Sequence, residues 1–322
     1  MTPPCASSWQ VWTALWLVYV VWGSTYLAIA YVVDTVPPLV GMGLRFGAAA
    51  ALLATYVVVR RGPAALRVTP QQLRSATVVG LLLLLGGNGL VAVAEAAELP
   101  SGLAALLVAA IPLWVVLLRW LADDRPSAVT VGGVALGFVG LAVLLLPGAR
   151  PDGVAGLAVA TVLLGALLWS VGSFYATRAQ LPEDGLVTTT LEMAAGSVGL
   201  LVVGLSRGER LDVSEVSTSS WLALGYLVVF GSLVAFTAYA WLLTAAPVSQ
   251  VSTYAYVNPV VAVALGAVLR GEDVTGLTLV GGAVTVLAVA VVVREEGRRR
   301  AAERAGDASV DQVEAGRTAV RR

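Results

Sequence analysis

This chain of 322 residues is 58% hydrophobic and only 12% charged, and its mean hydropathy of +0.86 excludes an ordinary soluble domain. It has no histidine and no lysine, which excludes P-loops, Ser-Lys dyads, HExxH zinc sites and Ser-His-Asp triads. Cys5 is the single cysteine, so no intramolecular disulfide or CxxC site can form. The sequence therefore has to be interpreted against a lipid bilayer.

Ten apolar stretches long enough to cross a bilayer follow one another along the chain. They cover residues 9–30, 37–59, 73–94, 100–120, 129–146, 153–175, 186–205, 220–243, 248–269 and 274–293. The charge-free stretch 216–269 is too long for one helix and is divided near Pro247. The prediction is an all-α integral membrane protein with a short N-terminus (1–8) and a charged tail (294–322) that is solvated or partly helical.

The two halves of the chain repeat one another at an offset of 147 residues. The offset matches Trp22 with Trp169, Arg45 with Glu192, Pro100 with Pro247, and Pro112 with Pro259. Matches that run from the first span to the last indicate a true duplication, with repeats at 9–146 and 153–293. Because each repeat has an odd number of spans, the second must enter the bilayer inverted, which is typical of secondary transporters.

The arginines predict the orientation in the membrane. Seven of them lie in loops on one side of the ten-span arrangement and eight more in the tail, whereas the opposite loops hold only Arg150, Arg207, Arg210 and Arg270. Cytoplasmic loops carry the excess of positive charge, so both termini are predicted to be cytoplasmic.

Arg45 and Glu192 are charged residues inside predicted spans, where a charge is costly and must face protein or water. A rise of about 1.5 Å per residue separates them by about 10 Å in depth, so a direct bond, a bridging water and a bridging substrate all fit. A structural ion pair is one interpretation. The alternative is that Arg45 holds a carboxylate while Glu192 carries a proton or an amine.

Three polar residues lie near the end of the third span. Glu95 and Glu98 are either wet residues at the external interface or, for Glu95, part of the mouth of a cavity. Asn88 lies two turns deeper and is flanked by glycines, which permit close helix approach or local unwinding.

Prolines and aromatic residues provide further candidates. Pro112 and Pro259 lie within their spans, where proline kinks a helix, and matched kinks suit a rocking motion although static kinks are the alternative. Gly133 and Gly137 form a small-residue contact motif for internal packing or a dimer interface. The deeper aromatic residues are candidates for an aromatic cavity, with simple packing as the alternative for each: Trp22, Tyr26, Trp169, Tyr175, Tyr239, Tyr254 and Tyr256.

Several motifs together resemble the EamA family of the drug/metabolite transporter superfamily, over almost the whole chain up to about residue 293. The motifs are Trp22-Gly23-Ser24-Thr25-Tyr26, Leu44-Arg45-Phe46, Gly87-Asn88-Gly89-Leu90, Pro100-Ser101-Gly102, Pro112-Leu113, Gly231-Ser232, Ala238-Tyr239 and Tyr254-Ala255-Tyr256-Val257-Asn258-Pro259. The resemblance implies ten helices in two inverted five-helix repeats around a central cavity. It also implies movement of small metabolites, often amino acids and usually outward. Glu192 is a departure that is not carried over from the family.

The resulting prediction is a transporter in the plasma (inner) membrane that exports a small metabolite such as an amino acid by alternating access. An ion gradient, with the proton as candidate ion, or the solute's own gradient drives it. The expected partners are the substrate and the lipid bilayer, with no nucleic acid, cofactor or metal, and a homodimer is compatible with the sequence. The alternatives are an intramembrane enzyme built from Ser24, Thr25, Ser170, Ser173 and Glu192, or a sensor or scaffold that does not transport.

Overall fold

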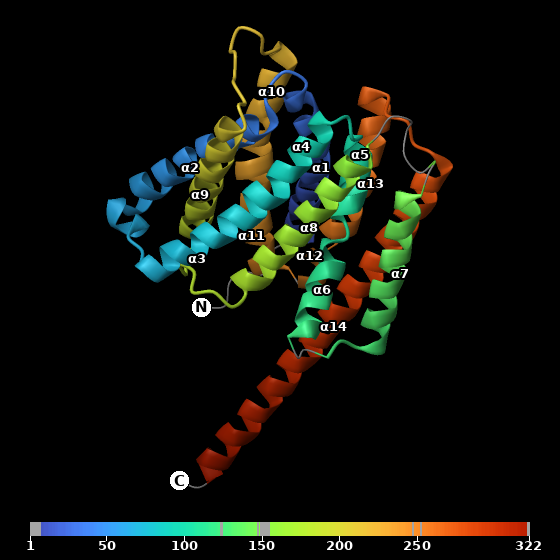
Figure 1. Ribbon diagram of the computed structural model, residues 1–322. Helices are drawn as coiled ribbons and strands as arrows, with labels where there is room; N and C mark the ends of the chain where they lie inside the picture. Colours follow the sequence, from blue (N-terminus) through green and yellow to red (C-terminus); the bar gives the residue numbers. More distant parts are fainter. Residues whose placement is uncertain are drawn as a thin grey trace.

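The computed structural model describes residues 8–122, 125–146, 148, 155–246, 248–251 and 253–320, and every regular element within these ranges is helical (Figure 1). Pro247, predicted to begin a helix, and residue 153, the predicted start of the second repeat, lie outside the described residues. The all-α class predicted from composition is confirmed.

The first half of the chain contains nine helical segments, several of which continue directly into one another. They are α1 (Ser8–Val33), α2 (Pro38–Arg61), η1 (Pro63–Leu66), α3 (Pro70–Gly80), η2 (Leu81–Gly89), α4 (Leu90–Ala96), α5 (Ser101–Val108), α6 (Ile111–Leu121) and α7 (Ala128–Leu145). The α3, η2 and α4 segments form one membrane span, Pro70–Ala96, and α5 with α6 forms another, Ser101–Leu121.

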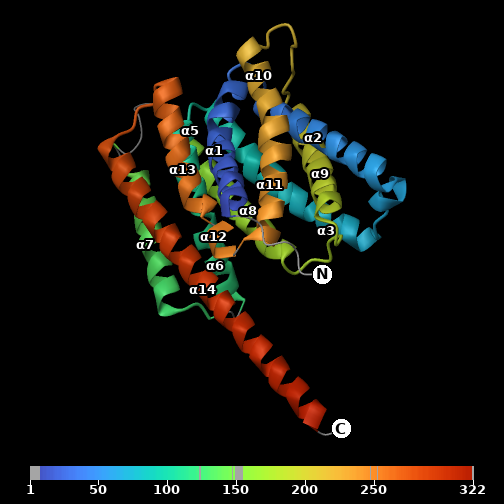
Figure 2. The ribbon, with the colours of Figure 1, turned by 180° about the vertical axis from the view of Figure 1, so that it is seen from behind.

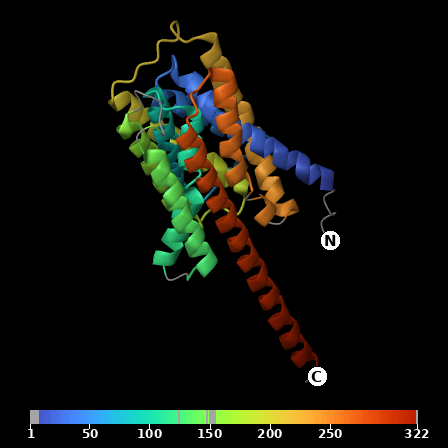
Figure 3. The same cartoon turned by 90° about the vertical axis from the view of Figure 1, so that its right-hand side faces the viewer.

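The second half follows the same plan with a longer last helix. Its elements are α8 (Gly156–Ala176), α9 (Gly185–Ser206), α10 (Thr218–Tyr226), η3 (Leu227–Val234), α11 (Ala235–Ala245), α12 (Val248–Val251), α13 (Tyr254–Leu265), η4 (Gly266–Arg270) and α14 (Gly276–Val320). The charged tail continues α14 as a helix that projects beyond the bundle (Figure 3).

Nine helices of the described chain are long and apolar enough to cross a membrane, and Tyr254–Arg270 is a shorter apolar helix. The ninth span was predicted as one continuous stretch, 248–269. In the structure α12 ends at Val251 and α13 begins at Tyr254, so this prediction of the span is wrong in detail. The apolar helix Tyr254–Arg270 occupies the place of this ninth span and brings the number of apolar helices in the described chain to ten.

Local sequence signals explain several helix starts. Thr69 begins α3 with a capping box, in which Thr69 Oγ1 accepts from the Gln72 backbone N–H and the Gln72 side chain accepts from the Thr69 N–H. The side chains of Ser127 and Ser217 cap α7 and α10 in the same position. These capping residues determine where the chain leaves each loop and begins a membrane helix.

The wider π-helical turn appears at matching places in the two repeats. Leu81–Gly89 (η2) and Leu227–Val234 (η3) begin 146 residues apart, in the third span of each repeat. Such turns shift the helical register and are frequent at functional sites. The local irregularity predicted from the glycines around Asn88 is therefore present, and it is duplicated.

Small residues permit the closest helix contacts. A Cβ added at Gly133 would lie 2.7 Å from the Val292 side chain on α14, and one at Gly137 would lie 2.2 Å from Leu113 on α6. The Gly133 and Gly137 motif therefore packs inside the protomer, as one of the two predicted interpretations required.

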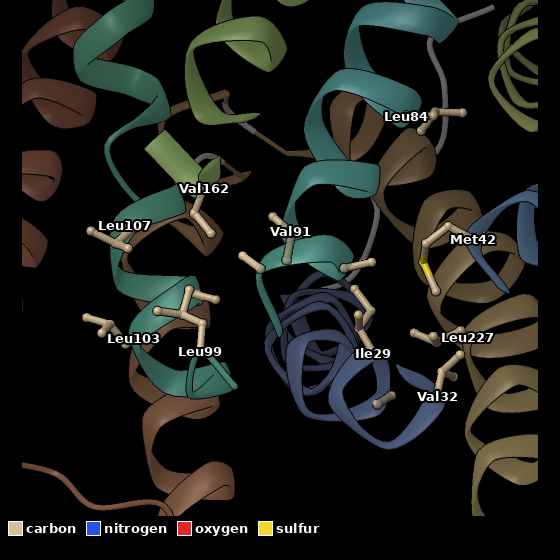
Figure 4. Close-up of a cluster of buried hydrophobic side chains, with 14 of the residues drawn as sticks. Ile29, Val32, Met42, Leu84, Val91, Leu99, Leu103, Leu107, Val162 and Leu227 are labelled. Carbon is tan, nitrogen blue, oxygen red and sulfur yellow. The ribbon is translucent and has the colours of Figure 1, made fainter. Parts of the chain in front are cut away.

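The N-terminal end of α1 and the C-terminal end of α14 lie at the same end of the molecule (Figures 1 and 2). This end is called the termini side, and the opposite end, with the α1–α2, α4–α5 and α9–α10 loops, is called the distal side. Between the two sides, aliphatic side chains from α1, α2, α4 and α5 form the core, including Ile29, Val32, Met42, Val91 and Leu103 (Figure 4).

Candidate functional site

A cavity of about 420 Å³ lies in the centre of the bundle. Both repeats line it, through α1, α2, η2 and α5–α6 on one hand and α8, α9, η3 and α13 on the other. A volume of this size matches the sites that enclose small molecules. The cavity is therefore the candidate functional site.

Most residues predicted from sequence for a central cavity line it. They are Trp22, Tyr26, Arg45, Asn88, Trp169, Glu192, Tyr239, Tyr254 and Asn258, together with Pro112 and Pro259. These residues come from spans far apart in the sequence, so only the folded bundle brings them together.

Three predicted residues do not line the cavity. Tyr175 follows the lining residue Ser173 by two positions, and Tyr256 follows the lining residue Tyr254 by two. Two positions correspond to about 200° around a helix, so both side chains point away from the cavity. Glu95 is only 6% exposed and does not line the cavity, so neither of its predicted placements, at the wet interface or at the mouth of the cavity, is correct.

Arg45 is held by the second repeat and presents its charge to the cavity. It is 5% exposed, its Nε donates to Ser232 Oγ at 3.1 Å, and its guanidinium carbon lies 4.7 Å from the centre of the Phe46 ring. Guanidinium has five N–H donors, so others are available to a ligand in the cavity that Arg45 lines. A planar donor set of this kind is suited to a carboxylate.

Glu192 faces the same cavity from α9 but is not tied in the same way. The structure gives no ion pair between Arg45 and Glu192 among the described residues, although both line the cavity. The position equivalent to Ser232 in the first repeat is Leu85, which has no group to bond Glu192. Leu85 instead packs near Gly199 on α9.

Three aromatic rings form one wall of the cavity. Trp22 lies 5.1 Å from Tyr239 and 5.2 Å from Tyr254 between ring centres, and the two tyrosines lie 5.5 Å apart. Trp22 Nε1 donates to the Gly231 backbone oxygen at 3.2 Å, which fixes the indole against η3. Such a wall can contact apolar groups or the face of an ammonium group.

Several lining residues were not among the candidates that the sequence gave for the cavity. Ser232, Thr25 and Ser173 contribute hydroxyl groups, and Phe46 and Phe236 contribute rings. Ser232 and Thr25 stand within the motifs that carry the family resemblance, and that position was the available signal. Phe236 and Ser173 have no local signal, because their facing depends on helix rotation.

Buried side chains close the cavity toward the distal side. Ile29, Val91 and Ala105, which line it toward the distal ends of their helices, are buried. Near the opposite helix ends, Ser173 and Glu192 are half-buried, and Thr189 and Met193 are buried.

Polar contacts between loops hold the distal side together. The guanidinium of Arg270 donates to both carboxylate oxygens of Asp34, at 3.0 and 2.6 Å. The Glu272 carboxylate accepts from the backbone N–H groups of Ser101 and Gly102, and Glu209 accepts from those of Leu39 and Val40. An acidic group at a helix N-terminus is favourable, so these carboxylates anchor α5 and α2.

The two prolines have different settings. Pro112 lies in the first turn of α6, directly after the break between α5 and α6. Pro259 lies inside α13, seven residues beyond the interruption that follows α12. Both line the cavity, and a hinge role for either one stays a prediction.

A family model explains the arrangement of two halves around one cavity. The model of the EamA-like transporter family matches residues 11–146 and again residues 156–294. The chain belongs to the EamA-like transporter family. It is a multi-pass membrane transporter of the drug/metabolite transporter type, built from two five-helix repeats.

Relatives of this EamA-like chain carry transporter names. It is 38% identical over 280 residues to "Uncharacterized inner membrane transporter YedA" of Escherichia coli (strain K12), covering 87% of this chain and 89% of that protein. It is 26% identical over 281 residues to "Probable amino-acid metabolite efflux pump" of the same organism, covering 82% and 88%. A crystal structure that is 23% identical has a TM-score of 0.61 and covers 91% of this chain, so it shares the fold.

Proposed function

We propose that this EamA-like transporter carries a small zwitterionic metabolite of the amino-acid class from the cytoplasm to the outside. Its two halves, 9–146 and 153–293, form the alternating-access machinery, and both termini lie in the cytoplasm. The observation that supports this substrate class is that two side chains of opposite charge, Arg45 and Glu192, line one cavity of about 420 Å³.

The two charges divide an amino acid between them. Arg45 contributes a fixed guanidinium for the α-carboxylate, because Ser232 holds its Nε while other N–H groups remain available. Glu192 contributes an acceptor for the α-ammonium group from the other repeat. A substrate that bridges the two also satisfies charges that would otherwise be costly inside the bilayer.

The aromatic wall suits the side chain of such a substrate. Trp22, Tyr239 and Tyr254 offer apolar ring surface beside the charged groups. A relative with 26% identity carries the name of an amino-acid metabolite efflux pump, which supports the same substrate class and the outward direction. The arginine-rich loops on the termini side support a cytoplasmic position for both ends.

The alternative of an intramembrane enzyme receives no support from three of the four hydroxyl groups proposed for it. Ser24 Oγ donates to the Val21 backbone oxygen, and Ser170 Oγ donates to that of Ala166. Thr25 Oγ1 donates to the Trp22 backbone oxygen. These hydroxyls are engaged with their own helices, and the chain has no histidine or lysine to activate them.

The test uses purified protein in liposomes and three matched probes. They are leucine, leucinamide, in which a neutral amide replaces the carboxylate, and isoamylamine, in which the carboxyl group is absent. Wild type is expected to exchange leucine and to discriminate against both amines. Arg45→Ala is expected to lower leucine exchange by about 100-fold, corresponding to loss of about 3 kcal/mol of charge-assisted bonding, while the amines change little.

Arg45→Lys serves as the matched variant because it keeps the charge and loses the planar fork. It is expected to recover part of the leucine exchange. Leucine exchange by Arg45→Ala at the wild-type rate would contradict the proposal. If wild type transports no member of a mixture of the proteinogenic amino acids, the amino-acid class itself is wrong.

A further inference from the structure

Glu95 is an acidic side chain that the proposed substrate site does not use. It lies on α4, close to the distal end of the third span, and is 6% exposed. Neither of its carboxylate oxygens has a hydrogen-bond partner within the described part of the protein. Three other acidic groups on this side differ, because Asp34 pairs with Arg270, and Glu209 and Glu272 each accept two backbone N–H groups.

Buried apolar side chains flank Glu95 in the sequence, with Val91 one turn before it and Leu99 four residues after it. Ile29 from α1, Val91 from α4, and Leu99 and Leu103 on the way into α5 are buried in the same part of the core (Figure 4). An ionised carboxylate without donors in such surroundings is costly, whereas the neutral acid is tolerated. The closed distal side therefore accommodates Glu95 in its protonated form.

Few ionisable groups face Glu95 from the elements packed around it. Tyr26 on α1, Arg270 at the end of η4 and Glu272 just beyond η4 are close enough to interact with it electrostatically. Arg270 is already bonded to both oxygens of Asp34, and Glu272 is bonded to the start of α5. The helices α5 and α8 contain no acidic or basic residue, and the charged residue within the α2 span, Arg45, is bonded to Ser232.

We propose that Glu95 is a proton-binding site that couples this transporter to the proton gradient. When the distal loops separate, external water reaches the carboxylate and one of its oxygens takes up a proton. The neutral side chain then permits the distal side to close around it, and the cycle is completed when the proton leaves to the cavity past Tyr26, which interacts with Glu95 and lines the cavity. This inference rests on the proposed transport function. It adds that the coupling ion is a proton bound by Glu95, at a place distinct from Arg45 and Glu192, which bind the substrate.

The position of Tyr26 connects the proton site with the substrate cavity. Tyr26 lines the cavity and is also the α1 neighbour that interacts with Glu95. Movement of α1 on substrate binding therefore alters the environment of Glu95 directly.

The first experiment needs no substrate. Infrared difference spectroscopy of the full chain in lipid vesicles compares wild type with Glu95→Gln, and Glu98→Gln serves as the control because Glu98 is exposed three residues away. The expected result is a carboxylic-acid carbonyl band in wild type at neutral pH that persists in Glu98→Gln and disappears in Glu95→Gln. A spectrum of Glu95→Gln equal to that of wild type overturns the proposal.

The second experiment measures coupling in liposomes with a mixture of the proteinogenic amino acids as the probe. A pH gradient is expected to raise accumulation by wild type and by Glu98→Gln about tenfold. Glu95→Gln is expected to keep amino-acid exchange within about threefold of wild type while the pH gradient no longer raises accumulation. Accumulation that still follows the gradient in Glu95→Gln overturns the proposal.

Two other outcomes are informative. If Glu95→Gln loses exchange as well, the infrared band of the wild type decides whether the carboxyl group carries a proton, and absence of the band overturns the proposal. If wild type exchanges no amino acid, the proposed substrate class fails. The infrared comparison then still decides whether Glu95 binds a proton.

Discussion

The two repeats share a backbone plan and differ in the chemistry that they place on it. Each has a π-helical turn in its third span and an interruption in its fourth. At equivalent positions, however, Arg45 is bonded to Ser232, whereas the first repeat has Leu85, with no hydroxyl, at the position that matches Ser232. Duplication therefore supplies the cavity walls, and later divergence supplies the unlike charges that select a substrate.

The same contrast appears in the helix contacts behind the charges. On one side, Gly80 lets α3 approach α9 so closely that an added Cβ would lie 2.3 Å from the Glu192 backbone oxygen. On the other, the equivalent residue is Leu227, a fully buried side chain near Met42 of α2 (Figure 4). Glu192 is thus positioned by backbone contact and Arg45 by side-chain contact, so the two charges have different freedom to move.

Gly80→Ala is expected to have the largest effect of the variants that separate the two repeats. The new methyl group meets the backbone of α9, which cannot yield as a flexible side chain would, so the folded state should lose about 1–3 kcal/mol. Thermal unfolding in detergent measures the loss. Gly132→Ala is the control because nothing lies within 4 Å of its added Cβ, and equal melting temperatures for the two variants would contradict the backbone contact.

Ser232→Ala is expected to have an intermediate effect, because it removes the hydroxyl that anchors Arg45 and leaves Arg45 without the kind of anchor that Glu192 also lacks. Loss of the bond to Arg45 Nε removes about 1 kcal/mol of positioning, which should raise the KM for leucine exchange about fivefold. The matched control is Thr237→Val, since Thr237 is exposed and bonds only within its own helix. A KM unchanged by Ser232→Ala would show that Arg45 needs no anchor.

Asp34→Asn is expected to have the smallest effect and tests the link between the repeats on the distal side. The pair with Arg270 is about one-third exposed, with side-chain exposures of 32% and 41%, so its loss should favour opening only about two- to threefold. Labelling of Leu99→Cys by an external, membrane-impermeant maleimide, in a Cys5→Ser background, measures the opening. Asp212→Asn is the control because Asp212 bonds only to Ser214 in an exposed loop, and equal labelling rates would contradict a closing role.

Much of the site was predictable because membrane helices are constrained by length and charge. The apolar runs determine the number of spans, and the offset matches determine which residues share a depth, so Arg45, Glu192 and Trp22 could be assigned to a central cavity. The errors at Tyr175 and Tyr256 arose from helix rotation, which short apolar sequences do not encode. Glu95 was misplaced because depth alone does not reveal whether neighbouring helices cover a side chain.

The sequence by itself determined an all-helical, twice-repeated membrane protein with unlike charges in matching spans, because within a bilayer the polar N–H and C=O groups of an apolar segment can be satisfied in few other ways. Only the tertiary structure decided which of those side chains meet. It tied Arg45 to Ser232, left Glu192 facing the cavity, gathered Trp22, Tyr239 and Tyr254 into one wall, and enclosed Glu95 without a partner. The reason is that these contacts depend on how helices from both repeats rotate and pack against one another.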